Sequence, residues 1–309
     1  MALHLAIGGG GDVVMAAVLA GGGEVGHIPW ERYTVDPEPG PVPLSSFINA
    51  AVFDDGVAIA TGGSHVERGG RRFKTQGICV AETLGKSIYV VDSYLPPSRL
   101  ARSLARFKKV VGVDVGGDVL AVGCEEEVGS PLSDAYGLAL LAMLKKLGVE
   151  TEVVVMSPGA DGELDREYFL QRAAEVARMG GFLGSVGLSK GQLELLSALT
   201  RRCVTEASTA AARAAFGEWG EFPIRGGARR VKIDLFSTVG FRFDPEALLK
   251  VNKAARIVYE RDASMDKAAE LLLAAGIPTE WHLETLLSKG VEYKDAVSTL
   301  KKLKRCHNV

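Results

Sequence analysis

The chain opens with a short apolar strand, a run of glycines and an apolar helix, and this order constrains its fold most. Residues 3–7 are an apolar run typical of a buried strand, residues 8–11 are four consecutive glycines, and residues 12–19 have the composition of a buried helix. Glycine permits positive φ and lets a ligand approach the backbone, and the first N–H groups of a helix attract anions. The pattern predicts a ligand-binding turn; the alternative is a tight strand-to-helix connection that binds nothing.

Residues near this turn refine the prediction. The dinucleotide pattern requires a glycine where this chain has Val13, and Asp12 would repel a bare phosphate, although it could cap the helix or bind a metal. Glu31 follows the next predicted strand, at the distance where dinucleotide-binding folds place an acid for the ribose. The candidates for binding a nucleotide-like ligand at this end of the chain are therefore Gly9, Gly10, Gly11, Asp12 and Glu31.

Acidic residues and glycines also follow two later predicted strands. Asp114 and Asp118 flank a glycine pair after the apolar residues 110–113, and Asp161 follows a strand at residues 152–156. Parallel strands place their carboxyl ends at one edge of a sheet, so we expect these acids to share a pocket with the glycine turn. We predict that Asp114, Asp118 and Asp161 hold Mg²⁺ or sugar hydroxyls and that one of them is a general base. Local turn hydrogen bonds are the alternative.

Two further groups are candidates for contacting the ligand. Ser130, followed by Pro131, predicts a helix start that offers the ligand a hydroxyl and free N–H groups. Arg225 or Arg229, beside a glycine pair, could bind a phosphate or carboxylate through two hydrogen bonds; we select Arg225. A surface hairpin with solvated arginines is the alternative for this segment.

The alternation of apolar strands and helices predicts an α/β fold that is Rossmann-like, with a mostly parallel sheet and flanking helices. Short apolar runs at residues 57–61, 78–80 and 87–91 predict further strands. After residue 243 only helical patterns follow. We therefore divide the chain into a ligand-binding α/β domain at residues 1–243 and a helical C-terminal subdomain at residues 244–309.

Composition bounds the partners of the chain. Its 309 residues are 47% hydrophobic and 24% charged, with a formal net charge of −2, as in ordinary folded proteins. Nucleic-acid binding rests on concentrated positive charge, so we expect a small-molecule ligand and no nucleic acid. No apolar run approaches the length of a membrane span and no leader precedes the first strand, so we expect no membrane partner and a cytoplasmic location. A homo-oligomer stays open.

The cysteines and histidines form no metal-binding motif. The five histidines are scattered and the four cysteines are far apart in the sequence. We therefore expect no structural zinc site, and reduced thiols are the default. The cysteines are Cys79, Cys124, Cys203 and Cys306.

Several of these motifs together resemble one family. They are GGGGDV at residues 8–13, PWER at residues 29–32, DxGGD at residues 114–118, GSPLSDA at residues 129–135 and DGE at residues 161–163. The set looks like a mainly archaeal family catalogued as a domain of unknown function. The resemblance covers most of residues 1–240 and implies a prokaryotic cytoplasmic enzyme, without bringing an established activity or catalytic residues.

Two functional hypotheses of different classes follow. The first is an enzyme that carries out transfer or hydrolysis on a nucleotide-like or phosphorylated small molecule, assisted by Mg²⁺. The second is a nucleotide-sensing regulatory binding protein without catalysis, whose C-terminal helices bind a partner. A nicotinamide-dependent oxidoreductase is a weaker third hypothesis because of Val13. The chain has no Walker lysine, serine elbow or catalytic cysteine motif that would narrow the choice.

Overall fold

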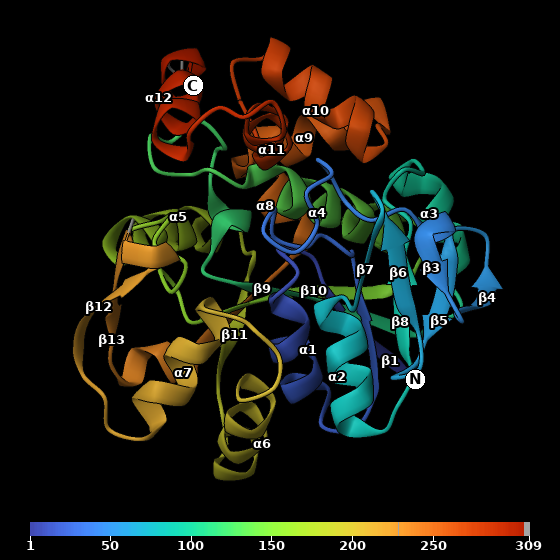
Figure 1. Cartoon of the computed structure of the whole chain (residues 1–309). Helices are drawn as coiled ribbons and strands as arrows, with labels where there is room; N and C mark the ends of the chain where they lie inside the picture. Colours follow the sequence, from blue (N-terminus) through green and yellow to red (C-terminus); the bar gives the residue numbers. More distant parts are fainter. Residues whose placement is uncertain (228, 306–309) are drawn as a thin grey trace.

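The computed structural model describes residues 1–227 and 229–305. One large sheet lies at its centre, and helices pack around it (Figure 1). Within the described residues the sheet has nine strands in the order β11-β14-β10-β9-β1-β2-β8-β5-β4. Its central strands are parallel: β10 (Glu150–Met156), β9 (Lys109–Val115), β1 (Ala2–Ala6), β2 (Glu24–His27) and β8 (Ile88–Val91). The prediction of an α/β fold with a mostly parallel sheet is confirmed.

Antiparallel strands extend the sheet on both sides. Next to β10 lie β14 (Val239–Phe243) and then β11 (Phe182–Gly187), and next to β8 lie β5 (Val57–Ala60) and then β4 (Ala51–Asp54). Two small antiparallel sheets lie outside it: β3 (Phe47–Ile48), β6 (His65–Arg68) and β7 (Arg71–Phe73) in one, and β12 (Gly220–Ile224) and β13 (Arg229–Ile233) in the other. In the main sheet, the antiparallel pairs β14–β11 and β5–β4 therefore flank the parallel strands at both edges.

Helices cover both faces of the sheet because alternate side chains of each strand point to opposite faces. On β1, Leu3 and Leu5 pack into one layer and Ala6 packs into the other. The layer on the Ala6 side contains α1 (Asp12–Ala20), α2 (Gln76–Leu84), α6 (Lys190–Thr200) and α7 (Ala207–Ala215). The opposite layer contains α3 (Pro97–Leu104), α4 (Pro131–Lys146), α5 (Arg166–Arg178), α8 (Pro245–Val251), α9 (Lys253–Arg261) and α10 (Met265–Ala274). None of the described helices is long and apolar enough to cross a membrane.

The long helix α4 lies at the centre of the second layer. Gly137 lets it approach β1 closely, since a Cβ on Gly137 would overlap the side chain of Ile7. Helices α8, α9 and α10 contact α4, and buried side chains such as Leu248 and Val258 belong to the same hydrophobic core as α4 and the sheet. The chain continues with α11 (Glu280–Ser288) and α12 (Tyr293–Leu303). Helices α8, α9 and α10 therefore share a core with the layers that precede them.

The prediction of a strand at residues 78–80 is wrong, because this segment lies inside α2. Thr75 caps the helix, and its hydroxyl oxygen accepts a 3.2 Å hydrogen bond from the N–H of Ile78. An apolar run of three residues fits a buried turn of helix as well as it fits a strand. The N-cap, together with packing against α1, decides the outcome.

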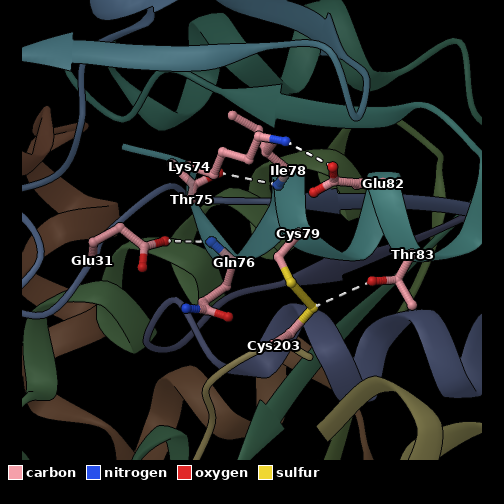
Figure 2. Close-up of a disulfide and its surroundings, with 9 residues drawn as sticks. All are labelled: Glu31, Lys74, Thr75, Gln76, Ile78, Cys79, Glu82, Thr83 and Cys203. Carbon is pink, nitrogen blue, oxygen red and sulfur yellow. Dashed lines mark hydrogen bonds and ion pairs between the residues drawn. A yellow bond between two sulfur atoms is a disulfide. The ribbon is translucent and has the colours of Figure 1, made fainter. Parts of the chain in front are cut away.

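Cys79 and Cys203 form a disulfide (Figure 2), so the expectation of reduced thiols is wrong for this pair. The two residues are 124 positions apart in the sequence, but their Cα atoms are only 5.7 Å apart. They meet because α2, α6 and α7 all pack beside α1, an arrangement that cysteine spacing does not reveal. Cys306 lies outside the described residues.

Candidate functional site

The predicted site residues lie where the chain reverses its direction across the sheet. From β1 the chain adds β2 and β8 on one side, and then β9 and β10 on the other. In open parallel sheets, ligands bind at such a reversal, outside the carboxyl ends of the strands. The turn at residues 8–11 follows β1, Asp114 and Asp118 lie at the end of β9, and Asp161 follows β10. Acids from three strand ends therefore meet on one rim of the sheet.

The glycine turn requires glycine for steric reasons. A Cβ on Gly10 would overlap the carbonyl oxygen of Trp30, which accepts a 3.0 Å hydrogen bond from the Gly10 N–H. A Cβ on Gly11 would lie 2.6 Å from the hydroxyl oxygen of Thr205. Gly9 differs, since no described atom outside its immediate chain neighbours lies within 4 Å of its missing Cβ. The turn glycines lack positive φ, so that part of the prediction is wrong: close packing explains Gly10 and Gly11, while Gly9 faces open space.

Two buried carboxylates flank the start of this turn. A Cβ on Gly8 would overlap the carboxylate of Asp12, which begins α1 and also accepts a 3.4 Å hydrogen bond from the N–H of Val115. Asp134, in the first turn of α4, places Oδ1 3.1 Å from the same missing Cβ. For both acids, burial and the charges of neighbouring carboxylates, among them Asp114, raise the pKa well above the ordinary value. The turn is therefore bounded by acids.

Three more acids continue the group, and we call all five the acidic cluster: Asp12, Asp114, Asp118, Asp134 and Asp161. A Cβ on Gly116 would overlap the carboxylate of Asp161. Burial and then the charge of Asp161 raise the pKa of Asp114 to about 7. Burial and then the charge of Glu163 raise the pKa of Asp161 to about 6 and that of Asp118 well above its ordinary value. The predicted metal-binding and general-base residues are thus within electrostatic reach of one another.

Two oxygens of the acidic cluster are buried without a hydrogen-bond partner among the described residues: Asp118 Oδ1 and Asp134 Oδ1. A buried carboxylate oxygen without a partner costs free energy, and the like charges around it add to that cost. A proton or a bound cation relieves both. In the described part of the chain no group of three or more His, Cys, Asp or Glu side chains is arranged to hold a metal ion, so a cation here would need ligands from outside the protein.

The N–H and hydroxyl groups of Ser130 already donate hydrogen bonds to a carboxylate of the protein. Glu163 accepts hydrogen bonds from the Ser130 hydroxyl at 2.8 Å, the Ser130 N–H at 2.9 Å and the Gly129 N–H at 2.6 Å. Arg229 forms an ion pair with Glu163 at 2.7 Å. Burial acts to raise the pKa of Glu163, but the charge of Arg229 and the hydrogen bonds to the carboxylate outweigh burial and lower the pKa to about 2. Glu163 therefore carries its charge with hydrogen-bond donors and a cation as partners.

Glu280, from α11, binds the rest of the α4 N-terminus. Its carboxylate accepts hydrogen bonds from the N–H groups of Leu132 at 3.1 Å and Ser133 at 2.9 Å. Burial raises the pKa of Glu280 to about 7 despite these bonds. The prediction that a helix starts at Ser130 and Pro131 is confirmed by α4. The prediction that its first N–H groups are free is wrong, because the carboxylates of Glu163 and Glu280 already accept their hydrogen bonds.

Glu31 lies beside the glycine turn, and Arg225 lies further out. Glu31 Oε1 is 3.2 Å from the missing Cβ of Gly10 and accepts a 2.8 Å hydrogen bond from the Gln76 N–H, drawn in Figure 2. Burial raises the pKa of Glu31 to about 7. Arg225 is exposed, and its N–H and guanidinium lie 3.2 and 3.6 Å from the carboxylate of Glu206. The structure thus places Glu31 at the turn and Arg225 on the exposed surface beside Glu206.

Three site acids were not among the predicted binding or catalytic residues: Asp134, Glu163 and Glu280. Asp134 and Glu163 lie in the motifs GSPLSDA and DGE, and their position after predicted strands or in the first turn of a helix is a usable signal. Glu280 lies in the C-terminal helices, far from any such motif, and no sequence pattern connects it to α4. Of the two arginines considered, Arg229 rather than Arg225 is the one that pairs with a site acid.

A family model described as a protein of unknown function, DUF1152, matches residues 3–288. The match covers most of the chain, so the chain belongs to this family. The prediction that it belongs to a family catalogued as a domain of unknown function is confirmed. No curated protein and no solved structure matches the chain.

Proposed function

We propose that this member of the DUF1152 family is an enzyme that binds a phosphate-bearing, nucleotide-like small molecule together with Mg²⁺ and catalyses a transfer or a hydrolysis. The order of the parallel strands supports a Rossmann-like fold, since β8, β2, β1, β9 and β10 correspond to the order 3-2-1-4-5 of nucleotide-binding sheets. The ligand would lie over the carboxyl ends of β1 and β9.

The observation that carries the proposal is the pair of unpartnered oxygens, Asp118 Oδ1 and Asp134 Oδ1, inside a buried cluster of like charges. These acids would repel a bare phosphate, whereas Mg²⁺ between phosphate and carboxylate makes the contact attractive. Mg²⁺ usually keeps several waters and binds through one or two carboxylates plus substrate phosphates. Such an ion needs no preformed set of three protein ligands, and the described residues form none.

Each group then has a role. Gly9 and the N-terminus of α1 would receive the phosphate, because Gly9 faces open space. Asp118 and Asp161 would bind Mg²⁺ or its waters. Asp114, with a pKa of about 7, has the proton affinity that suits a general base at neutral pH. Glu31 would accept a hydrogen bond from a ribose hydroxyl.

The remaining predicted contacts are also proposals. Arg225 would approach the phosphate from the exposed surface beside the cluster, since its charge already acts on Asp161. A cytoplasmic location stays a prediction, and the oligomeric state stays open.

Thermal unfolding with defined ligands tests this proposal. We expect Mg²⁺ with ATP, ADP or glucose 6-phosphate to raise Tm by more than the sum of the effects of Mg²⁺ and of that compound alone. Asp118→Asn and Asp161→Asn should each abolish this joint effect, because each removes a charge that would bind the metal. Asp295→Asn, on the exposed surface of α12, is the matched control and should keep it.

Turnover assays on any stabilising compound complete the test. Release or transfer of phosphate that requires Asp114 supports the enzyme. Stabilisation without turnover favours the nucleotide-sensing regulatory protein instead. If no nucleotide or sugar phosphate raises Tm with Mg²⁺, or if both aspartate variants respond like the control, the assignment of the acidic cluster is wrong.

A further inference from the structure

The Cys79–Cys203 disulfide joins two segments that each lead to the glycine turn. Cys79 lies in α2, and Cys203 lies in the α6–α7 connection, residues 201–206. Helices α2, α6 and α7 all contact α1, the helix that begins at the turn. The disulfide therefore links two segments that both pack near α1 but are far apart in the sequence.

On the α2 side, the link to the site runs through the start of the helix. Gln76, three residues before Cys79, donates its N–H to Glu31 at 2.8 Å, and Figure 2 shows this bond beside the disulfide. Glu31 in turn lies against Gly10. Movement of α2 would thus be transmitted to the acid beside the turn.

On the other side, the α6–α7 connection forms part of the wall of the turn. The Thr205 hydroxyl, two residues after Cys203, lies 2.6 Å from the missing Cβ of Gly11. Ser208, at the start of α7, donates a 3.4 Å hydrogen bond from its hydroxyl to the Gly11 carbonyl oxygen. Glu206 of the same connection pairs with Arg32 at 3.0 Å. The disulfide therefore holds this wall against α2.

The two cysteine residues differ in their exposure to solvent. Cys203 is buried, with 1% of its surface exposed, whereas Cys79 is partly exposed. A thiolate from a dithiol would attack Cys79 Sγ, breaking the S–S bond and leaving its electron pair on Cys203 Sγ, which then takes up a proton. The second thiol of the reductant would attack its own sulfur in the mixed disulfide, releasing Cys79 as a thiol and leaving the reductant oxidised. The Thr83 hydroxyl, 3.9 Å from Cys203 Sγ, is placed to stabilise the released sulfur.

We propose that the Cys79–Cys203 pair is a redox modification site whose reduction by a dithiol releases the α6–α7 connection from α2 and loosens the wall of the glycine turn. The consequence for ligand affinity rests on the proposed function. The loosening itself does not, and it can be measured without any ligand.

Hydrogen exchange of the ligand-free protein, before and after treatment with excess dithiothreitol, tests the proposal. Thiol alkylation and mass spectrometry first establish that Cys79 and Cys203 have been reduced. We then expect backbone amides of residues 8–13 and 201–208 to exchange at least ~10-fold faster after reduction. Peptides from α9, on the opposite face of the sheet, are the internal reference and should be unchanged.

A variant separates this disulfide from every other effect of the reductant. Cys79→Ser/Cys203→Ser should show the faster exchange at residues 8–13 without dithiothreitol and no further change with it; Cys79→Ser alone serves if the double variant does not fold. Equal acceleration in all peptides would mean that the disulfide only constrains the unfolded chain, and would overturn the proposal. Unchanged exchange after complete reduction, or resistance of the native disulfide to the dithiol, would do the same. Since no ligand is present, none of these outcomes depends on whether the chain is an enzyme.

Discussion

Arg229 and Arg230 are neighbours in the sequence but lie in opposite environments. Arg229 pairs with the buried Glu163, whereas Arg230 pairs with Glu221 on the exposed surface. We expect Arg229→Met to lower the free energy of unfolding by roughly 3 kcal/mol, because it leaves the Glu163 charge buried without its partner. Arg230→Met should change it by no more than about 0.5 kcal/mol. Urea unfolding at neutral pH measures both; similar losses would show that the buried pair contributes nothing special.

Asp114 is expected to cost stability in the ligand-free protein at neutral to alkaline pH. Its pKa is about 7 in the folded protein and near 3.8 in the unfolded chain, so its ionisation in the folded state is unfavourable. Asp114→Asn should therefore raise the free energy of unfolding by roughly 1–3 kcal/mol at pH 8 and by much less at pH 4. Denaturation at the two pH values tests this, with Asp295→Asn as the exposed control. A loss of stability at pH 8 would contradict the prediction.

At the scale of the elements, the contact between α4 and β1 depends on one glycine. A Cβ on Gly137 would overlap Ile7, so Gly137→Ala must push the helix off the strand or distort side chains. We expect this substitution to lower the free energy of unfolding by roughly 1–3 kcal/mol. Gly191, near the start of α6, has no described atom within 4 Å of its missing Cβ, so Gly191→Ala should be neutral or stabilising by up to about 1 kcal/mol. Thermal or urea unfolding of the pair decides; equal effects would refute the close contact.

The elements also show where local patterns suffice. Residues 12–19 and the Ser130-Pro131 start predict α1 and α4 correctly, because composition and a helix start signal act within a few residues. Residues 78–80 are wrongly predicted as a strand, because three apolar residues are too few to show helical or strand periodicity. The Thr75 N-cap favours the helix instead. The carboxylates of Glu163 and Glu280, which accept hydrogen bonds from the N–H groups at the start of α4, belong to distant elements. No local pattern could predict these bonds.

At the scale of the whole molecule, burial of many acids predicts a specific pH dependence. Burial raises the pKa of Glu31 and Glu280 to about 7 and that of Glu284 to about 8, as it does for Asp114. Between pH 6.5 and 8 the folded protein therefore holds more protons than the unfolded chain, and its free energy of unfolding falls as the pH rises. The slope is about 1.4 kcal/mol per pH unit for each proton of difference.

Other groups act in the opposite direction at lower pH. Burial lowers the pKa of His27 to about 3, so below pH 6.5 the unfolded chain takes up a proton that the folded protein does not. The free energy of unfolding therefore falls as the pH decreases. Glu163, with its pKa of about 2, contributes stability that is present above about pH 4.5 and is lost in acid. Urea unfolding of the ligand-free protein between pH 6.5 and 8 isolates the effect of the raised carboxyls. A free energy of unfolding that rises across this interval would contradict it.

The sequence by itself determined the α/β class, the strand, turn and helix at the amino end, and the acids that follow β9 and β10. Apolar periodicity and glycine act over a few residues, so they can be read without coordinates. Only the tertiary structure decided which groups meet. The strand order brings Asp12, Asp114 and Asp161 together, and α11 places Glu280 at the start of α4. The packing of the helices beside α1 brings Cys79 and Cys203 into one disulfide. Burial and electrostatic repulsion depend on distances through space, and residues far apart in the sequence set them.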